Sequence, residues 1–266
     1  MGYVSVVIRN KNESDALGKM LPMLFHYYKD DIAEVIVVDN QSTDNSVAIA
    51  KQYGCKVITI DKFTYGKALN LGIEHAIQNY VLLLSAHALP VGASFFKSAI
   101  AVFENDRHLA GVRFVNSFAN YQDAYNRADS INNPLEKGLM NACAMINKKV
   151  WEQYPFDESL GFSEDKYWSA LVIKHGYTIR NVTETFFYFA KRDQTATINR
   201  FKNESIANGV INNRKPQPLL KILFSSFYTM TVVNLITFFK RIGYEAKLLK
   251  AKLAIRKALK QNTSKQ

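Results

Sequence analysis

Cysteine is scarce in this chain of 266 residues. Only Cys55 and Cys143 are present, and they lie far apart in the sequence. Neither belongs to a Cys-x-x-Cys pair, which argues against a zinc knuckle and against a disulfide framework. So few cysteines suit a protein that stays in a reducing compartment.

The N-terminus lacks the long apolar core and the cleavage site of a signal peptide. Its opening segment MGYVSVVIRNKNE enters a β-rich run at once, so we expect no secretory leader. Internal repeats and low-complexity tracts are also missing. Hydrophobic residues make up 48% of the chain and charged residues 21%, which is typical of a globular protein rather than a disordered or fibrous one. A chain of this length can bury one substantial core and carry an appendage.

Acidic residues are almost missing from the C-terminal end. The net charge of the chain is +11, but residues 240–266 contain nine Lys and Arg against Glu245 alone, a surplus of eight. The other 239 residues therefore carry a net charge of only +3. This basic tail has no aromatic residues interleaved with its charges after Tyr244 and no recognition module, so we expect no nucleic-acid partner.

Short β-rich runs alternate with helical patterns in the first half of the chain. We expect strands at 3–9, 34–38, 56–60 and 80–84, and helices at 14–28, 44–53 and 67–78. The second and fourth strands are continuous apolar runs, as expected for strands covered on both faces. Gly54 stands where a helix C-cap is needed. The alternation predicts an α/β fold with a Rossmann-like, mostly parallel central sheet flanked by helices.

The pattern is looser beyond Pro90. We expect helices at 92–104 and 163–175, strands at 111–116 and 141–147, and a polar, Asn-rich connection at 121–139. Ser163 is the expected N-cap of the helix that follows it.

Polar residues cluster directly after two neighbouring strands. The first strand ends in RNKNE (9–13) and the second in DNQSTD (39–44). Because the carboxyl ends of adjacent parallel strands line the crevice where a nucleotide lies, these segments supply candidate nucleotide ligands. The candidates are Arg9, Asn12, Glu13, Asp39 and Gln41. Asp44 has a structural explanation as a helix cap. Asp39 follows a buried strand, and we expect it to have no such structural role.

In the order and spacing of several motifs, the sequence resembles the family 2 glycosyltransferases, which have the GT-A fold. The resemblance runs from Val4 to about Asn213. It rests on VSVVIRNKNE, on VIVVDNQSTDNS, on the Gly-x-x-x-Asn-x-Gly segment at 66–72, and on FDE at 156–158 before Glu164-Asp165. Each motif is weak alone, and their order and spacing together are specific.

This resemblance implies an inverting glycosyltransferase. The enzyme would move a sugar from a nucleotide-diphosphate donor, with a UDP-sugar expected, to a hydroxyl of a glycan or lipid-linked acceptor. It implies that Glu13 and Asp39 hold the nucleoside, that Lys67 lies near the diphosphate, and that Asn70 of the same segment belongs to the donor site. Lys67 could equally be a solvated helix residue. The expected role is cell-surface polysaccharide synthesis.

The end of the fourth strand departs from the family pattern. Family members usually have an Asp-x-Asp there that holds a divalent metal, and this chain has Ser85-Ala86-His87 instead. Mn²⁺ and Mg²⁺ prefer oxygen ligands, so the loss of both acids argues against a bound metal. Ser85 and His87 remain candidates for the donor site. His87 could ligate manganese through a ring nitrogen, or, when protonated, hydrogen-bond the leaving diphosphate directly.

A second departure points the same way. In the stretch that resembles residues 186–192, family members often carry a His that completes the metal site, and this chain has none. Lys191 and Arg192 could neutralise the departing diphosphate in place of a metal.

Glu164-Asp165 resembles the acidic pair that contains the catalytic base. A carboxylate is needed to take the proton of the acceptor hydroxyl as it attacks the anomeric carbon. We expect Asp165 to be this base and Glu164 to orient it. The alternative is structural, because acids at a helix N-terminus are favoured by the macrodipole, which also lowers their pKa unless burial offsets it.

A linker at Lys215-Pro216-Gln217-Pro218 separates a catalytic domain, expected at 1–214, from a helical tail at 215–266. Residues 222–239 contain no charge, which is at the lower limit for a membrane span. Nucleotide sugars and Lys/Arg-rich flanks both favour the cytoplasm, so we expect an in-plane or re-entrant segment, followed by a helix at 242–259 that is rich in lysine. The expected location is cytoplasmic, peripheral at the inner face of the plasma membrane, and the alternatives are a tail packed on the domain or an oligomer contact.

Two other functions remain open from the residues. A catalytically degenerate, glycosyltransferase-like binding subunit would explain the missing Asp-x-Asp. A sugar nucleotidyltransferase shares a Rossmann-like start, but it should have a Gly-rich loop directly after the first strand, where RNKNES has no glycine. The pattern predicts no oligomeric state.

Overall fold

The computed structural model describes residues 3–126, 131–190, 193–212 and 214–263. The chain divides into two compact units, Met1–Asn213 and Arg214–Gln266. This division falls beside the linker that the sequence indicates.

The first unit is built around one mixed sheet of eight strands in the order β3-β2-β1-β4-β7-β6-β8-β5. The strands are β1 (Val4–Asn10), β2 (Ile32–Asp39), β3 (Lys56–Thr59), β4 (Tyr80–Ser85), β5 (Ala88–Val91), β6 (Leu109–Val115), β7 (Cys143–Asn147) and β8 (Thr178–Tyr188). The first four strands along the sheet are parallel, while β7 is antiparallel to β4 and to β6, and β5 is antiparallel to β8. The α/β fold with a largely parallel first half is confirmed.

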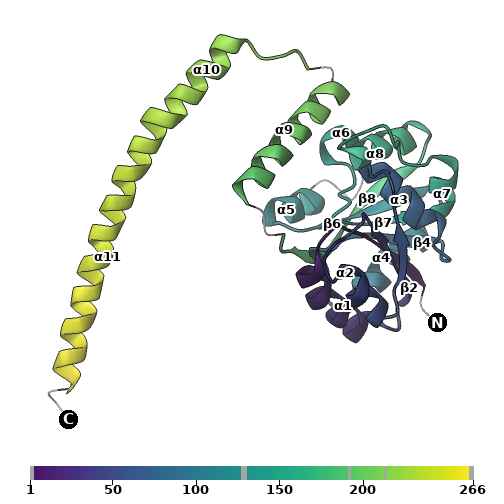
Figure 1. Ribbon diagram of the computed structural model, residues 1–266, viewed down its shortest axis with the longest axis horizontal. Coiled ribbons are helices and arrows are strands. Elements are labelled where there is room, and N and C mark those ends of the chain that lie inside the picture. Colours follow the sequence, from purple (N-terminus) through teal and green to yellow (C-terminus); the bar gives the residue numbers. More distant parts are fainter. Residues whose placement is uncertain (1–2, 127–130, 191–192, 213, 264–266) are drawn as a thin grey trace. The chain divides into compact units, whose positions relative to one another are not determined.

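Helices flank both faces of this sheet (Figure 1). They are α1 (Ser14–Tyr28), α2 (Ser46–Gln52), α3 (Tyr65–Glu74), α4 (Phe95–Asn105), α5 (Phe118–Asn126), α6 (Pro134–Lys137), α7 (Lys148–Gln153), α8 (Glu164–Lys174) and α9 (Gln194–Ile211). Gly54 follows α2 with φ +72°, the left-handed conformation expected of a C-cap glycine.

Two hydrophobic clusters lie on the two faces of the sheet. Alternate residues of β1 point to opposite sides, so Val6 and Ile8 join the cluster that contains α1 and α4, and Val7 joins the cluster that contains α3 and α8. Burial on both faces explains why these strands are apolar without alternation.

The second half of the first unit contains more regular structure than the sequence predicts. The expected polar connection at 121–139 holds α5 and α6, and β5, α7, β8 and α9 were not expected at all. None of the residues of α9 is buried, so this helix has no apolar stripe to reveal it.

Strand register brings the polar segments together at one edge of the sheet. Arg9 of β1 lies opposite Ser85 of β4, and Asn10 lies opposite Asp39 of β2. All four residues stand at or next to the carboxyl ends of parallel strands, where ligands bind in open α/β sheets.

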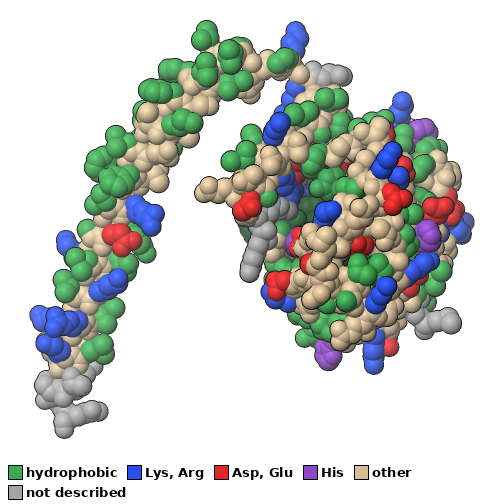
Figure 2. Space-filling view, viewed as in Figure 1, with side chains coloured by type: hydrophobic (Ala, Val, Ile, Leu, Met, Phe, Trp, Pro, Cys, Tyr) green, Lys and Arg blue, Asp and Glu red, His purple; other side chains and the backbone are tan. Residues whose placement is uncertain are grey.

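Residues Leu219–Thr263 of the second unit form one continuous helix. Its parts are α10 (Leu219–Tyr228), a π-helical turn at Thr229–Val233 and α11 (Asn234–Thr263). The helix expected at 242–259 is present and is part of a longer helix that also contains the apolar segment. By length and composition alone, the stretch Leu219–Lys257 could cross a membrane, and none of its most apolar window is buried. On the face that Figure 2 shows, hydrophobic side chains lie along this helix, and Lys and Arg gather toward its C-terminal end.

Candidate active site

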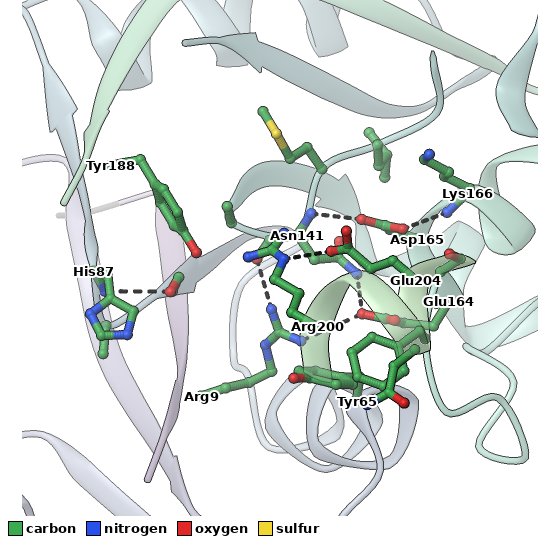
Figure 3. Close-up of a pocket in the computed structure, with 18 of the residues that line it drawn as sticks. Arg9, Tyr65, His87, Asn141, Glu164, Asp165, Lys166, Tyr188, Arg200 and Glu204 are labelled. Carbon is green, nitrogen blue, oxygen red and sulfur yellow. Dashed lines mark hydrogen bonds and ion pairs between the residues drawn. The ribbon is translucent and has the colours of Figure 1, made fainter. Parts of the chain in front are cut away.

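A cleft of about 970 Å³ opens at the carboxyl ends of β1 and β4. Residues from β1, β4, α8 and α9 line it, and they include six of the residues singled out from the sequence: Arg9, Glu13, Ser85, His87, Glu164 and Asp165. Figure 3 shows the acid pair facing Arg9 and Arg200, with His87 and Tyr188 on the other side of the cleft.

The acid pair occupies the first turn of α8. Ser163 precedes it with φ +64° and makes no side-chain cap, so the expected capping hydrogen bond is absent. Asn141 binds both acids instead: its side-chain amide donates to Glu164 Oε1 at 3.2 Å, and its backbone N–H donates to Asp165 Oδ2 at 3.1 Å. The backbone N–H of Lys166 donates to Asp165 Oδ1 at 2.8 Å. Both carboxylates are therefore held in fixed orientations.

Burial governs the ionisation of the two acids. It raises the pKa of Glu164, and the charge of Asp165 raises it further, while Arg9 and Asn141 oppose the shift. Burial also raises the pKa of Asp165, against the lowering effect of the N–H groups of Asn141 and Lys166 and of the Arg9 charge. Carboxylates with raised pKa values are better proton acceptors than ordinary surface acids, so the pair has the chemistry of a general base.

Arg9 lies against the acid pair. Its Nη2 donates to the Asn141 carbonyl at 3.0 Å, and its Nη1 is 3.4 Å from Glu164 Oε1. The guanidinium also stands over the ring of Tyr65, 5.1 Å from its centroid. Only 14% of the Arg9 side chain is exposed, so these protein contacts use most of its surface.

His87 stands at the end of β4 and pairs with Glu13. Its Nε2 is 2.9 Å from Glu13 Oε1, and its backbone N–H donates to Ser85 Oγ at 3.4 Å. Among the residues that the structure describes, no three His, Cys, Asp or Glu side chains are grouped to hold a metal. One imidazole and one carboxylate fall short of the oxygen-rich ligand set that Mn²⁺ or Mg²⁺ requires, so the residues present do not fit the metal of the family pattern.

Asp39 is buried and is not among the residues that line the cleft. Only 2% of it is exposed, and its carboxylate accepts from Asn10 Nδ2 at 2.7 Å, from Ser42 N at 2.9 Å and from Ser42 Oγ at 2.6 Å. The expectation that Asp39 has no structural duty is wrong, because it fixes the turn that follows β2.

Asn12 and Gln41 shape the same loops and do not line the cleft. Both have positive φ, of 51° and 52°, and Asn12 Oδ1 accepts from Thr43 N at 2.7 Å. Asp44 caps backbone as expected: it accepts from Ser14 N and Ser46 N, and these bonds outweigh the effect of burial and hold its pKa at about 2.

Asn70 is a core residue, away from the lining of the cleft. Its Oδ1 accepts from Trp151 Nε1 at 2.9 Å and from Phe156 N at 3.0 Å, and its Nδ2 donates to Phe156 O and Glu158 Oε1. A Cβ on Gly66 would lie 2.5 Å from Asp157 O, so close backbone packing requires this glycine. The Gly-x-x-x-Asn-x-Gly segment therefore joins α3 to the 156–158 segment. Lys67, in the same helix, is half-buried and also lies outside the lining.

Lys191 and Arg192 lie outside the described residues. The structure instead adds cleft residues that the sequence patterns did not single out, namely Tyr65, Asn141, Tyr188, Arg200 and Glu204. Arg200 of α9 is 2.6 Å from Glu204 Oε1 and hydrogen-bonds Tyr188. No local signal marks these residues, because their roles depend on which elements meet across the cleft.

A sheet with parallel strand ends that open into a cleft, and a held acid pair in the lining of that cleft, is the arrangement of a GT-A-type glycosyltransferase domain. The chain belongs to glycosyl transferase family 2, whose sequence model matches residues 5–155.

Solved structures share this fold at low sequence identity. A mannosyltransferase from Pyrobaculum calidifontis, in complex with GDP-Man and Mn²⁺, is 20% identical with a TM-score of 0.63, over 85% of this chain and 69% of that one. Glucosyl-3-phosphoglycerate synthase from Mycobacterium tuberculosis, in complex with Mn²⁺, UDP and glucosyl-3-phosphoglycerate, is 13% identical with a TM-score of 0.61, over 81% of each chain.

A curated relative is similar over part of this chain. It is a dolichyl N-acetyl-alpha-D-glucosaminyl phosphate 3-beta-D-2,3-diacetamido-2,3-dideoxy-beta-D-glucuronosyltransferase from Methanococcus voltae, 27% identical over 124 residues. The match covers 42% of this chain and 38% of the relative, so this chain matches well under half of that protein's length.

Proposed function

We propose that the protein is an inverting glycosyltransferase that moves a sugar from a nucleotide-diphosphate donor to a hydroxyl of a glycan or lipid-linked acceptor. Asp165 is the general base and Glu164 orients it. Asp165 takes the proton of the acceptor hydroxyl, the hydroxyl oxygen bonds to the anomeric carbon, and the bond from that carbon to the nucleoside diphosphate breaks.

The acid pair is the observation that carries this proposal. Two carboxylates in the lining of a cleft, each held by hydrogen bonds and each with a raised pKa, form a general base whose orientation is fixed. Asp165 is the better candidate for direct contact with the acceptor, because it is partly exposed, whereas Glu164 is only 5% exposed and is paired with Arg9.

The donor occupies the cleft above the ends of β1 and β4. Glu13, Ser85 and His87 line this part directly, and Asp39, Asn12 and Gln41 support it by fixing the neighbouring loops. A UDP-sugar is the first donor to test, and a GDP-sugar is the second, since similar folds hold UDP or GDP-Man.

The leaving diphosphate is stabilised by hydrogen-bond donors and cations of the protein rather than by a divalent metal. His87 is the described group at the position of the family's metal ligands, and Lys191 and Arg192 are further candidates by sequence. Fixed positive groups aimed at developing charge can supply this stabilisation in a cleft that excludes water.

The tail holds the enzyme at a membrane surface. Exposed apolar residues and a surplus of eight positive charges suit a helix that binds anionic lipid. This location, at the cytoplasmic face of the plasma membrane, suits cell-surface polysaccharide synthesis on a lipid-linked acceptor. The Methanococcus voltae relative, which is named for a dolichyl sugar phosphate, supports such an acceptor.

A thermal-shift screen against nucleotide sugars, with and without Mn²⁺, tests the proposal. We expect one UDP- or GDP-sugar to raise the melting temperature, and release of the nucleoside diphosphate to be measurable once an acceptor is supplied. Failure of every nucleotide sugar to bind would overturn the proposal. Binding without turnover in any acceptor pool would instead identify a degenerate binding subunit.

A further inference from the structure

We infer that Arg9 is a positioning residue for the acid pair and does not bind the donor. The inference rests on the proposed function, because it assigns a role within the same site. It replaces the role that the sequence pattern suggests for Arg9, which is direct contact with the nucleotide.

The contacts of Arg9 are all directed at the acid side of the cleft. Nη2 donates to the carbonyl of Asn141, Nη1 approaches Glu164, and the guanidinium plane lies over Tyr65. An Arg that serves as a donor ligand needs exposed N–H groups, whereas this guanidinium is engaged by carbonyl, carboxylate and aromatic ring at once.

Asn141 connects Arg9 to both acids through hydrogen bonds. Arg9 fixes the Asn141 carbonyl, while the Asn141 amide groups bind Glu164 and Asp165. Asn141 is only 2% exposed, so it cannot compensate by turning toward water. One side chain at the end of β1 therefore orients two carboxylates on α8, more than 150 residues further along the chain.

Other charged groups also face the acid pair. Lys166 follows it on α8, Arg200 and Glu204 face it from α9, and Glu136 of α6 lines the same cleft. Arg9 is nevertheless the cation within ion-pair distance of Glu164 among the described residues. The charge of Arg9 lowers the pKa of both acids, against the raising effect of burial. Removal of this charge therefore raises the pKa of Glu164 and of Asp165.

The direction of the resulting pH effect follows from the role of the base. A general base works when it is ionised, so activity rises with pH through its pKa. Loss of the Arg9 charge shifts that rise to higher pH, and activity at high pH recovers in part. A lost donor ligand would behave differently, since nucleotide affinity would fall at every pH and the position of the rise would stay unchanged.

The test compares full-length wild type with Arg9→Gln and Arg9→Lys. We expect Arg9→Gln to shift the acid limb of kcat/KM upward by about one pH unit, with the Kd for UDP unchanged within about twofold. Arg9→Lys keeps the charge, so its acid limb should lie close to the wild-type pH. Lys11→Gln is the matched control: Lys11 is another cation of the cleft, but its Nζ binds the Asn40 carbonyl, so the acid limb should stay at the wild-type pH.

A second readout is independent of turnover. Carboxyl-carbon NMR titration of the ¹³C-labelled protein, with Glu164→Gln to assign the signal, should show the Glu164 titration move upward in Arg9→Gln. If the wild type has no transferase activity but this titration moves, the proposed function fails and the inference about Arg9 stands. An unmoved titration and acid limb, or a loss of UDP affinity in Arg9→Gln and Arg9→Lys alike, would overturn the inference.

Discussion

His87 and Glu13 form a pair at the end of β4, with 2.9 Å between Nε2 and Oε1. The pair joins the end of a central strand to the residue before α1, and both side chains line the cleft. Where the family pattern has two acids, this chain has a His that already has a carboxylate partner. The chemistry at this point of the cleft is therefore that of a hydrogen-bonding imidazole.

Excess chelator should leave the enzyme active. We expect turnover and donor-induced stabilisation to change less than about twofold when EDTA replaces Mn²⁺, because the described residues hold no group of three His, Cys, Asp or Glu side chains that could bind a hard cation. The measurement is initial rate and melting temperature with the same nucleotide sugar under both conditions. Loss of activity in EDTA that Mn²⁺ restores would show that a metal is used after all.

Asp165→Asn should remove turnover and leave donor binding intact. Asn keeps the size of the side chain but cannot accept the acceptor proton, so kcat should fall by roughly 100- to 10,000-fold. Isothermal titration with UDP should give an unchanged Kd. Asp30→Asn, at an exposed acid outside the cleft, should leave both quantities at their wild-type values. Equal activity of Asp165→Asn and wild type would exclude Asp165 as the base.

The first half of the fold could be predicted because its signals are local. Continuous apolar runs mark β2 and β4, and α1 has buried residues at helical spacing, so its limits of Ser14 and Tyr28 agree with those expected. Helix α9 has no buried face, and β8 mixes polar and aromatic residues without strict alternation. Neither element therefore has a hydrophobic periodicity from which it could be predicted.

The site could be predicted only in part. Motif order located Glu164 and Asp165, but a pattern cannot show what holds them, because the contact between Arg9 and Asn141 spans 132 positions of sequence. The same limit explains the error about Asp39. Its partner Asn10 meets it only when β1 and β2 pair in register, whereas Ser42 is a local partner in the turn that follows β2.

Asn70→Ala should destabilise the domain without a direct effect on the cleft. The change leaves Trp151 Nε1 and Phe156 N without their acceptor in the core, which costs about 2–4 kcal/mol in the free energy of unfolding. Urea denaturation measures this difference. Asn105→Ala, at an exposed position of α4, serves as the control and should change stability by less than about 0.5 kcal/mol. A wild-type stability for Asn70→Ala would show that this network contributes little.

The tail should lie on the same side of the membrane as the catalytic unit. Cys55 and Cys143 are both buried, so a Cys introduced on the surface can be labelled selectively with a membrane-impermeant maleimide. We expect Lys250→Cys in the basic tail and Lys62→Cys in the catalytic unit to be labelled together in inside-out membrane vesicles, and neither to be labelled in right-side-out vesicles. An in-plane helix keeps its lysines at the anionic surface, whereas a spanning helix would carry Lys250 to the opposite side. Labelling of Lys250→Cys in right-side-out vesicles, with Lys62→Cys protected, would show that the uncharged stretch at 222–239 spans the bilayer.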